Sequence, residues 1–204
     1  MDGRGAGEGD RFVESWSDRE AEWYRLASRL PKASKTALAA ASAERLFPLY
    51  RVFAVARDGD DDGSALLRRA LDELWTAAET DTAPRSDNYA IALSVVPSVE
   101  QPDWIVESAF AQNAAAAVAY AAQTWQLDDP QQVVWALRQA IEAADSAADG
   151  RPEAISMAFV DQARDSIAYD CVLAANGSLG DLRRAASSDG SWGVALAEAW
   201  TQAE

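Results

Sequence analysis

Residues 108–125, SAFAQNAAAAVAYAAQTW, carry no charged side chain and are dominated by alanine. Alanine has the highest intrinsic helix propensity, so this stretch predicts a helix, which we extend over residues 103–125. Its small side chains let neighbouring backbones approach closely, and we therefore place it at the centre of the fold. Gln112, Asn113 and Gln123 interrupt the apolar surface, so the segment falls short of the continuous span of ~20 apolar residues that a bilayer requires.

Most of the remaining sequence also predicts helix. The expected helices cover residues 11–30, 32–57, 64–79, 131–149, 152–175, 179–186 and 192–203. The clearest helical period belongs to Leu67, Ala70, Leu71, Leu74, Trp75 and Ala78. Residues 1–10 are rich in glycine and charge, and we expect a disordered leader there. The sequence thus predicts an all-α, single-domain multi-helix bundle of about seven or eight helices over residues 11–204.

One segment is ambiguous. Residues 89–96, YAIALSVV, lie in a proline-containing region and form the only plausible strand of the chain. A short helix or an apolar loop fits the same residues, because short apolar runs do not separate these states.

The net charge of -15 restricts the function. Residues 58–107 hold twelve acidic and three basic side chains, and residues 126–170 hold nine and three. Such a field repels nucleic acid and anionic membranes, so we expect neither as a partner, and it attracts basic proteins. The start of the chain has no apolar stretch of signal-peptide type, which favours a cytoplasmic location.

Missing residue types exclude several kinds of chemistry. The sequence has no histidine, and its single cysteine, Cys171, lies in the apolar run IAYDCVLAA, where we expect a buried structural thiol. This removes a Cys–His nucleophile, a disulfide framework and a zinc site of several cysteines. No nucleophile-elbow, P-loop or dinucleotide-binding motif is present. We therefore predict no catalytic residue, no metal and no cofactor.

Two groups of carboxylates are candidate contacts for a basic partner. The first is the turn that contains Asp58, Asp60, Asp61 and Asp62. It matches the first half of a calcium loop, but the twelfth position is Arg69, where such loops need a bidentate glutamate. The second group is Glu142, Asp145 and Asp149, whose spacing places them on one face of a helix.

Eight tryptophans are many for a chain of 204 residues. Trp75, Trp104, Trp125 and Trp135 lie on or near apolar stripes, and we expect them in the core. Trp192 and Trp200 either pack inward or mark a contact surface, because tryptophan is enriched in binding hot spots.

The most specific motif is AERLFPLYRVF at residues 43–53, followed by LDELW at residues 71–75. This pair resembles the domain-of-unknown-function 416 family of bacterial (YjaG-like) proteins, and the resemblance extends loosely over residues 12–186. Ala43 stands where the family tends to have cysteine. The resemblance implies an all-helical single domain and no established activity.

The motif has a structural and a functional interpretation. In the structural one, Pro48 bends the helix, Glu44 pairs with a basic group or caps backbone donors near the bend, and Asp72 receives Arg45 or the hydroxyl of Tyr50. In the functional one, a pocket forms near the residues Glu44, Arg45, Pro48, Tyr50, Asp72 and Trp75.

Three hypotheses of function follow. The leading one is an acidic module that binds a basic protein partner, such as a toxin, and neutralises or regulates it in the manner of an immunity protein or antitoxin. The alternative is a small-ligand-binding protein or enzyme that uses the pocket near Glu44, Arg45, Tyr50 and Asp72. A homo-oligomeric structural protein is the third.

Overall fold

The computed structural model describes residues 8–57, 62–97, 104–151 and 157–203, with the backbone alone for residues 8–16. All regular structure in these ranges is helical, which confirms the all-α class. The helices are α1 (Glu8–Ala27), α2 (Lys32–Ala56), α3 (Asp62–Thr80), α4 (Asn88–Ser94), α5 (Val106–Leu127), α6 (Pro130–Gly150), α7 (Ala158–Ala175), α8 (Leu179–Ala186) and α9 (Trp192–Gln202).

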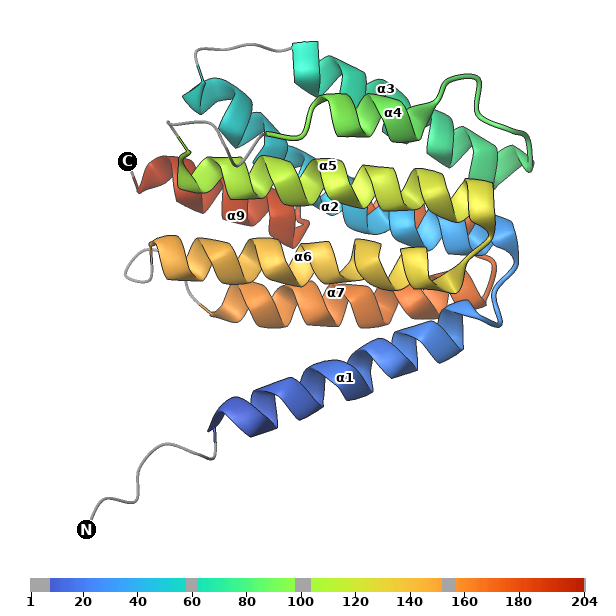
Figure 1. Cartoon of the computed structure of the whole chain (residues 1–204), viewed down its shortest axis with the longest axis horizontal. Coiled ribbons are helices and arrows are strands. Elements are labelled where there is room, and N and C mark those ends of the chain that lie inside the picture. The colour runs from blue at the N-terminus through green and yellow to red at the C-terminus, as the bar shows by residue number, and fades with distance from the viewer. Residues whose placement is uncertain (1–7, 58–61, 98–103, 152–156, 204) are drawn as a thin grey trace.

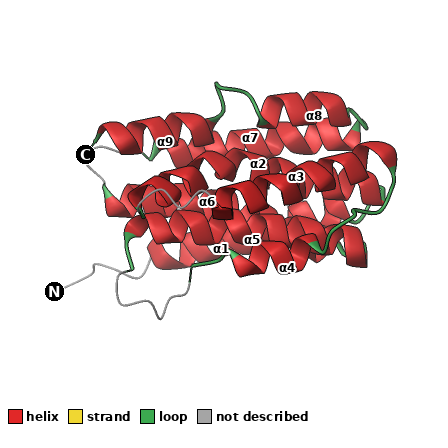
Figure 2. Cartoon of the chain, turned by 90° about the horizontal axis from the view of Figure 1, so that it is seen from above, coloured by secondary structure: helices red, strands yellow, loops and turns green. Residues whose placement is uncertain are grey.

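Helix α2 forms the axis of the bundle, with α5 packed along it (Figure 1). Every residue of α2 from Ser34 to Leu46 is buried, so this helix is surrounded on all sides. The alanine-rich α5 is central as predicted, and it shares that position with α2. Helices α4 and α5 lie on one side of α2, and α8 and α9 lie on the other (Figure 2).

The segment with the ambiguous pattern is a helix. Asn88–Ser94 form α4, and the side chain of Asp87 caps it by accepting a hydrogen bond from the N–H of Ala90. With α4, the described residues contain nine helices, one more than the upper value of the predicted seven or eight. The strand alternative for residues 89–96 is therefore wrong. The cap that Asp87 supplies stabilises the first turn of a helix there.

Most predicted helix ends lie within a few residues of the observed ones. Asp129 caps α6, with Pro130 in the first turn. Helix α1 begins at Glu8, before the predicted residue 11, while the rest of the predicted leader, residues 1–7, lies outside the described residues. None of the helices in the described ranges combines the length and hydrophobicity that crossing a bilayer requires.

The tryptophans divide differently from the prediction. Trp75, Trp125, Trp192 and Trp200 are buried, and the ring of Trp200 packs edge-on against Phe110 at 4.8 Å between centroids. The expectation that Trp104 and Trp135 are core residues is wrong, since each is 39% exposed. On the outer helices, the apolar stripe extends beyond the surface that neighbouring helices cover, so side chains at its edge are partly exposed.

Helix α9 crosses α2 at very short range. The backbone of Gly193, near the start of α9, lies against the carbonyl group of Arg45 in α2, and no side-chain atom fits between them. This contact places α9 directly over the Glu44–Arg45 motif.

Candidate functional site

The motif Glu44–Arg45 lies on α2 just before Pro48, which remains inside the helix. Successive residues of a helix point about 100° apart, so these two side chains leave α2 in different directions. Glu44 reaches α3, and Arg45 reaches α7 and α8. Both side chains are buried.

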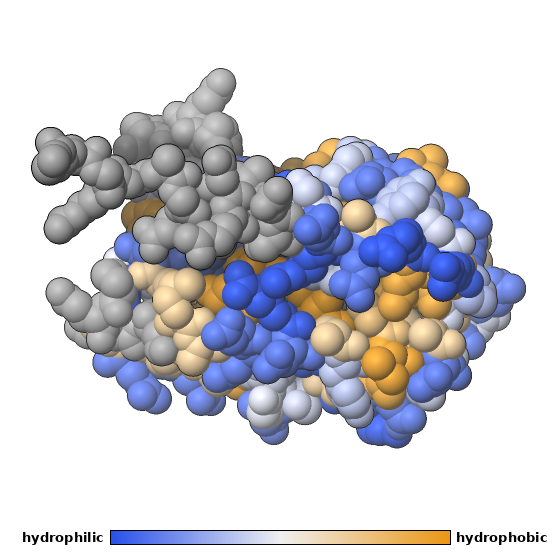
Figure 3. Space-filling view, turned by 90° about the horizontal axis from the view of Figure 1, so that it is seen from below, coloured by the Kyte–Doolittle hydropathy of each residue, from blue (hydrophilic) through white to orange (hydrophobic). Residues whose placement is uncertain are grey.

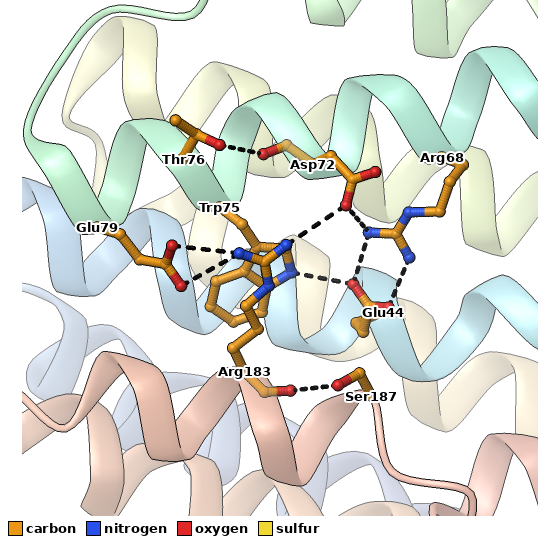
Figure 4. A network of polar contacts seen from close by, with 8 residues as sticks. All are labelled: Glu44, Arg68, Asp72, Trp75, Thr76, Glu79, Arg183 and Ser187. Carbon is orange, nitrogen blue, oxygen red and sulfur yellow. Dashed lines mark hydrogen bonds and ion pairs between the residues drawn. The ribbon is translucent and has the colours of Figure 1, made fainter.

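Glu44 accepts hydrogen bonds from two residues of α3 (Figure 4). The guanidinium of Arg68 binds both carboxylate oxygens, with Nη1–Oε1 at 2.6 Å and Nη2–Oε2 at 2.9 Å. The indole Nε1 of Trp75 donates to Oε2 at 3.0 Å. The predicted pairing of Glu44 with a basic group is confirmed, and the carboxylate is compensated by protein groups alone.

Asp72 extends this network to α8. Its Oδ1 accepts from Arg68 at 2.8 Å and lies 3.5 Å from Nη2 of Arg183 (Figure 4). Arg183 also binds Glu79 at 3.2 Å and lies over the ring of Trp75. The network therefore connects α2, α3 and α8 through alternating charges.

Arg45 forms a second, separate ion pair. Its Nε and Nη2 donate to the two oxygens of Asp170 in α7, at 3.0 and 2.7 Å, and its Nη1 donates to the carbonyl of Ala185 at 3.1 Å. The expectation that Asp72 receives Arg45 or the hydroxyl of Tyr50 is wrong. Arg45 points away from α3, and the Tyr50 hydroxyl donates to the carbonyl of Val95 at 3.2 Å.

The sequence interpretation missed Asp170, Arg68 and Arg183. Asp170 had a signal in the sequence: it is a lone charge in the apolar run IAYDCVLAA, and such a charge is stable in a core only when paired. Arg68 and Arg183 had no such signal in the sequence, because arginine on an amphipathic helix is usually solvated.

The pocket predicted around this motif is not a single cavity. Asp72 lines an open hollow of about 600 Å³ between α3 and residues 82–85, and Pro48 lines a different one between α2 and α9. Glu44 and Arg45 are held by the ion pairs above. Small-ligand binding beside Asp72 stays a prediction.

Cys171 is buried, as expected for a structural thiol. Burial, together with the charges of Asp170 and Glu22, raises the pKa of Cys171 to about 12. The group therefore remains a protonated thiol at neutral pH, which makes it a weak nucleophile.

The acidic groups proposed from the sequence are only partly described. Asp58, Asp60 and Asp61 lie outside the described residues, and Asp62 is exposed at the start of α3. On α6, Glu142 binds Arg138 at 2.6 Å, while Asp145 and Asp149 have no hydrogen-bonding or ion-pair partner among the described residues. The predicted common face of the three residues is present on α6.

Asp145 is electrostatically strained. Burial is the main cause that raises its pKa above the ordinary 3.8, and the charges of Asp149 and Glu142 add to it, while Arg164 opposes it. Ionised Asp145 is therefore less favourable in the folded protein than in the unfolded chain.

Asp145→Asn is expected to stabilise the protein at neutral pH by about 0.5 kcal/mol, the scale of like-charge pairs on a helix. Because the folded pKa is raised, the penalty is present above that pKa and is lost as the pH falls to the unfolded value. Thermal unfolding should show a gain of about 1 °C at pH 7. Near pH 3 the two proteins should melt together. Asp189→Asn, at an exposed carboxylate, serves as the control.

These features define a helical bundle in which two internal ion-pair networks connect the central helix α2, which contains Pro48, to its neighbours. No family model and no curated protein matches the chain. Among solved structures, it is similar to a DUF416 family protein from Shewanella baltica OS155, with 18% identity, a TM-score of 0.55, and coverage of 88% of this chain and 93% of the other. The resemblance to the domain-of-unknown-function 416 family is thereby confirmed at the level of the fold.

Proposed function

We propose that this protein is an acidic, cytoplasmic protein-binding module that binds a basic protein and neutralises or regulates it in the manner of an immunity protein or antitoxin. The observation that carries the proposal is a set of carboxylates on α6 and α7 without a direct hydrogen-bonding or ion-pair partner among the described residues, where Arg164 offsets only part of the strain at Asp145. Asp145, Asp149 and Asp165 have no partner among the described residues, although Arg138 and Arg164 lie on the same helices and pair with other acids.

A basic partner would relieve the strain at this surface. The cost of keeping Asp145 ionised beside Asp149 and Glu142 falls when a lysine or arginine of the partner comes close. The net charge of -15 would also accelerate the encounter with such a partner. The partner's active surface would then be covered rather than chemically changed.

A hollow lined by one of these carboxylates, Asp165, offers apolar surface to a long side chain. It measures about 610 Å³, lies between α1 and α7, and is lined by Trp23, Leu26 and Val172, with Glu22 and Asp165 balanced by Arg19 and Arg164. Lysine and arginine place their methylene groups on apolar surface and keep the charge outside. Figure 3 shows the underside of the bundle, where hydrophilic side chains border an exposed apolar strip.

The test is affinity capture from a native lysate at low ionic strength, followed by mass spectrometry. We expect the wild-type protein to retain a stoichiometric basic protein that added salt releases. The variant Asp145→Asn/Asp149→Asn/Asp165→Asn should bind it at least about tenfold more weakly, since each surface ionic contact contributes up to about 1 kcal/mol.

The matched control removes three carboxylates elsewhere, as Asp81→Asn/Asp189→Asn/Glu198→Gln. It has the same net charge as the test variant, so a loss confined to the test variant locates the interface. Equal binding by both variants, or retention of no basic protein, would contradict the proposal. Self-association detected by light scattering would favour the homo-oligomer instead.

A further inference from the structure

A small cavity lies at the end of the bundle where α2 begins, α5 ends and the chain passes from α3 to α4 (Figure 1). Its volume is about 320 Å³, the lower end of the range for small-molecule sites. Lys32, Asn88 and Trp125 line it together with apolar groups that include Leu74 and Pro84. None of the described residues that line this cavity carries a carboxylate, although the protein as a whole is strongly acidic.

Asn88 gives the cavity an unsatisfied hydrogen-bonding group. Its side chain is almost completely buried, at 2% exposure, and neither Nδ2 nor Oδ1 has a hydrogen-bond partner of normal geometry among the described residues. The amide lies near Glu73: burial opposes ionisation of that carboxylate, but the Ser86 side chain, backbone N–H groups and Asn88 together lower its pKa. A buried amide without partners is costly, so a group that satisfies it would bind favourably.

Lys32 gives the cavity a positive charge. Its Nζ lies 4.3 Å from the centre of the Trp125 ring, and it has no ion pair among the described residues. Lys32 is also the first residue of α2, whose N-terminus has no side-chain cap because Pro31 precedes it. The helix dipole therefore adds positive potential there. The nearby carboxylate of Asp128 is already neutralised by Lys35 at 2.5 Å.

We propose that this cavity binds a small organic carboxylate that also carries a primary carboxamide or a lactam. Such an amide presents N–H and C=O on one edge, which matches the adjacent Nδ2 and Oδ1 of Asn88. The carboxylate would face the ammonium of Lys32, and the carbon chain would contact Leu74 and Pro84. The site goes beyond the proposed function, since α6 runs away from it towards the opposite end of the bundle (Figure 1).

The proposal is tested by calorimetric titration with four probes. Succinamate and pyroglutamate carry both a carboxylate and an amide of the required kind. Succinate lacks the amide, and succinamide lacks the carboxylate. We expect the first two probes to bind the wild-type protein at least tenfold more tightly than the last two. Equal affinity for all four probes, or no binding at millimolar concentration, would overturn it.

Two variants locate the site. Asn88→Leu removes the unsatisfied amide at similar volume, so the protein should stay folded and lose binding of succinamate more than tenfold. Lys32→Gln should weaken it about tenfold, whereas Arg29→Gln removes an exposed cation that does not line the cavity and should leave it unchanged. Undiminished binding by folded Asn88→Leu would show that the probe does not contact the amide of Asn88, against the proposal.

Discussion

Gly193→Ala is expected to destabilise the protein by about 3 kcal/mol or more, although alanine normally strengthens a helix by about 1 kcal/mol relative to glycine. A Cβ at this position would overlap the carbonyl oxygen of Arg45 and lie 2.8 Å from its carbonyl carbon. These are backbone atoms, so no side-chain rotation can relieve the overlap, and α9 must move away from α2. Urea unfolding measures the loss, which corresponds to about 6–12 °C in Tm.

Gly180→Ala is the matched control for this substitution. Gly180 also lies in a helix, but its nearest neighbour would be the flexible side chain of Arg184 at 3.7 Å. Alanine there should be neutral or stabilise by up to about 1 kcal/mol. If Gly193→Ala were as stable as Gly180→Ala, the close crossing of α9 over α2 would be incorrect.

Arg45→Ala is the second large prediction, with an expected loss of 3–5 kcal/mol. The side chains of Arg45 and Asp170 are only 6% and 2% exposed, so removing the arginine leaves an uncompensated buried carboxylate. Arg69→Ala, at an exposed arginine, should change the free energy of unfolding by less than about 0.5 kcal/mol. Chemical denaturation of the three proteins gives the comparison.

A double variant separates the loss of a stabilising pair from the burial of an unpaired charge. Arg45→Met/Asp170→Leu replaces both ions with apolar groups, which is often neutral relative to a buried ion pair. It should therefore be more stable than Arg45→Ala. A double variant that is less stable than the single one would mean that the pair itself, and not the orphaned carboxylate, supplies the stability.

The helices were predictable because their signals are local. Alanine content, the apolar period of residues 67–78 and the cap at Asp129 with Pro130 act over a few residues, and α3, α5 and α6 follow them. The apolar pattern did not determine the secondary structure of residues 89–96, since the seven residues of α4 are too few to distinguish a helical period from a strand period.

The candidate site was predictable only in part. Glu44 and Arg45 could be selected from the motif, and a basic partner for Glu44 could be expected. The sequence did not indicate that Arg68 would pair with Glu44 or that Asp170 would pair with Arg45. These partners are 24 and 125 residues apart along the chain. Which acid meets which base depends on how α3, α7 and α8 are placed around α2.

The sequence by itself determined that this chain is a histidine-free, acidic bundle of helices, because composition and short-range periodicity are properties of neighbouring residues. Tertiary structure alone decided which charged side chains pair inside the bundle and which have no ion-pair partner among the described residues. It also decided that Asn88 is buried without a hydrogen-bond partner of normal geometry among the described residues, while Trp104 and Trp135 are partly exposed. The physical reason is that burial and pairing are set by helix packing, which joins residues far apart in sequence.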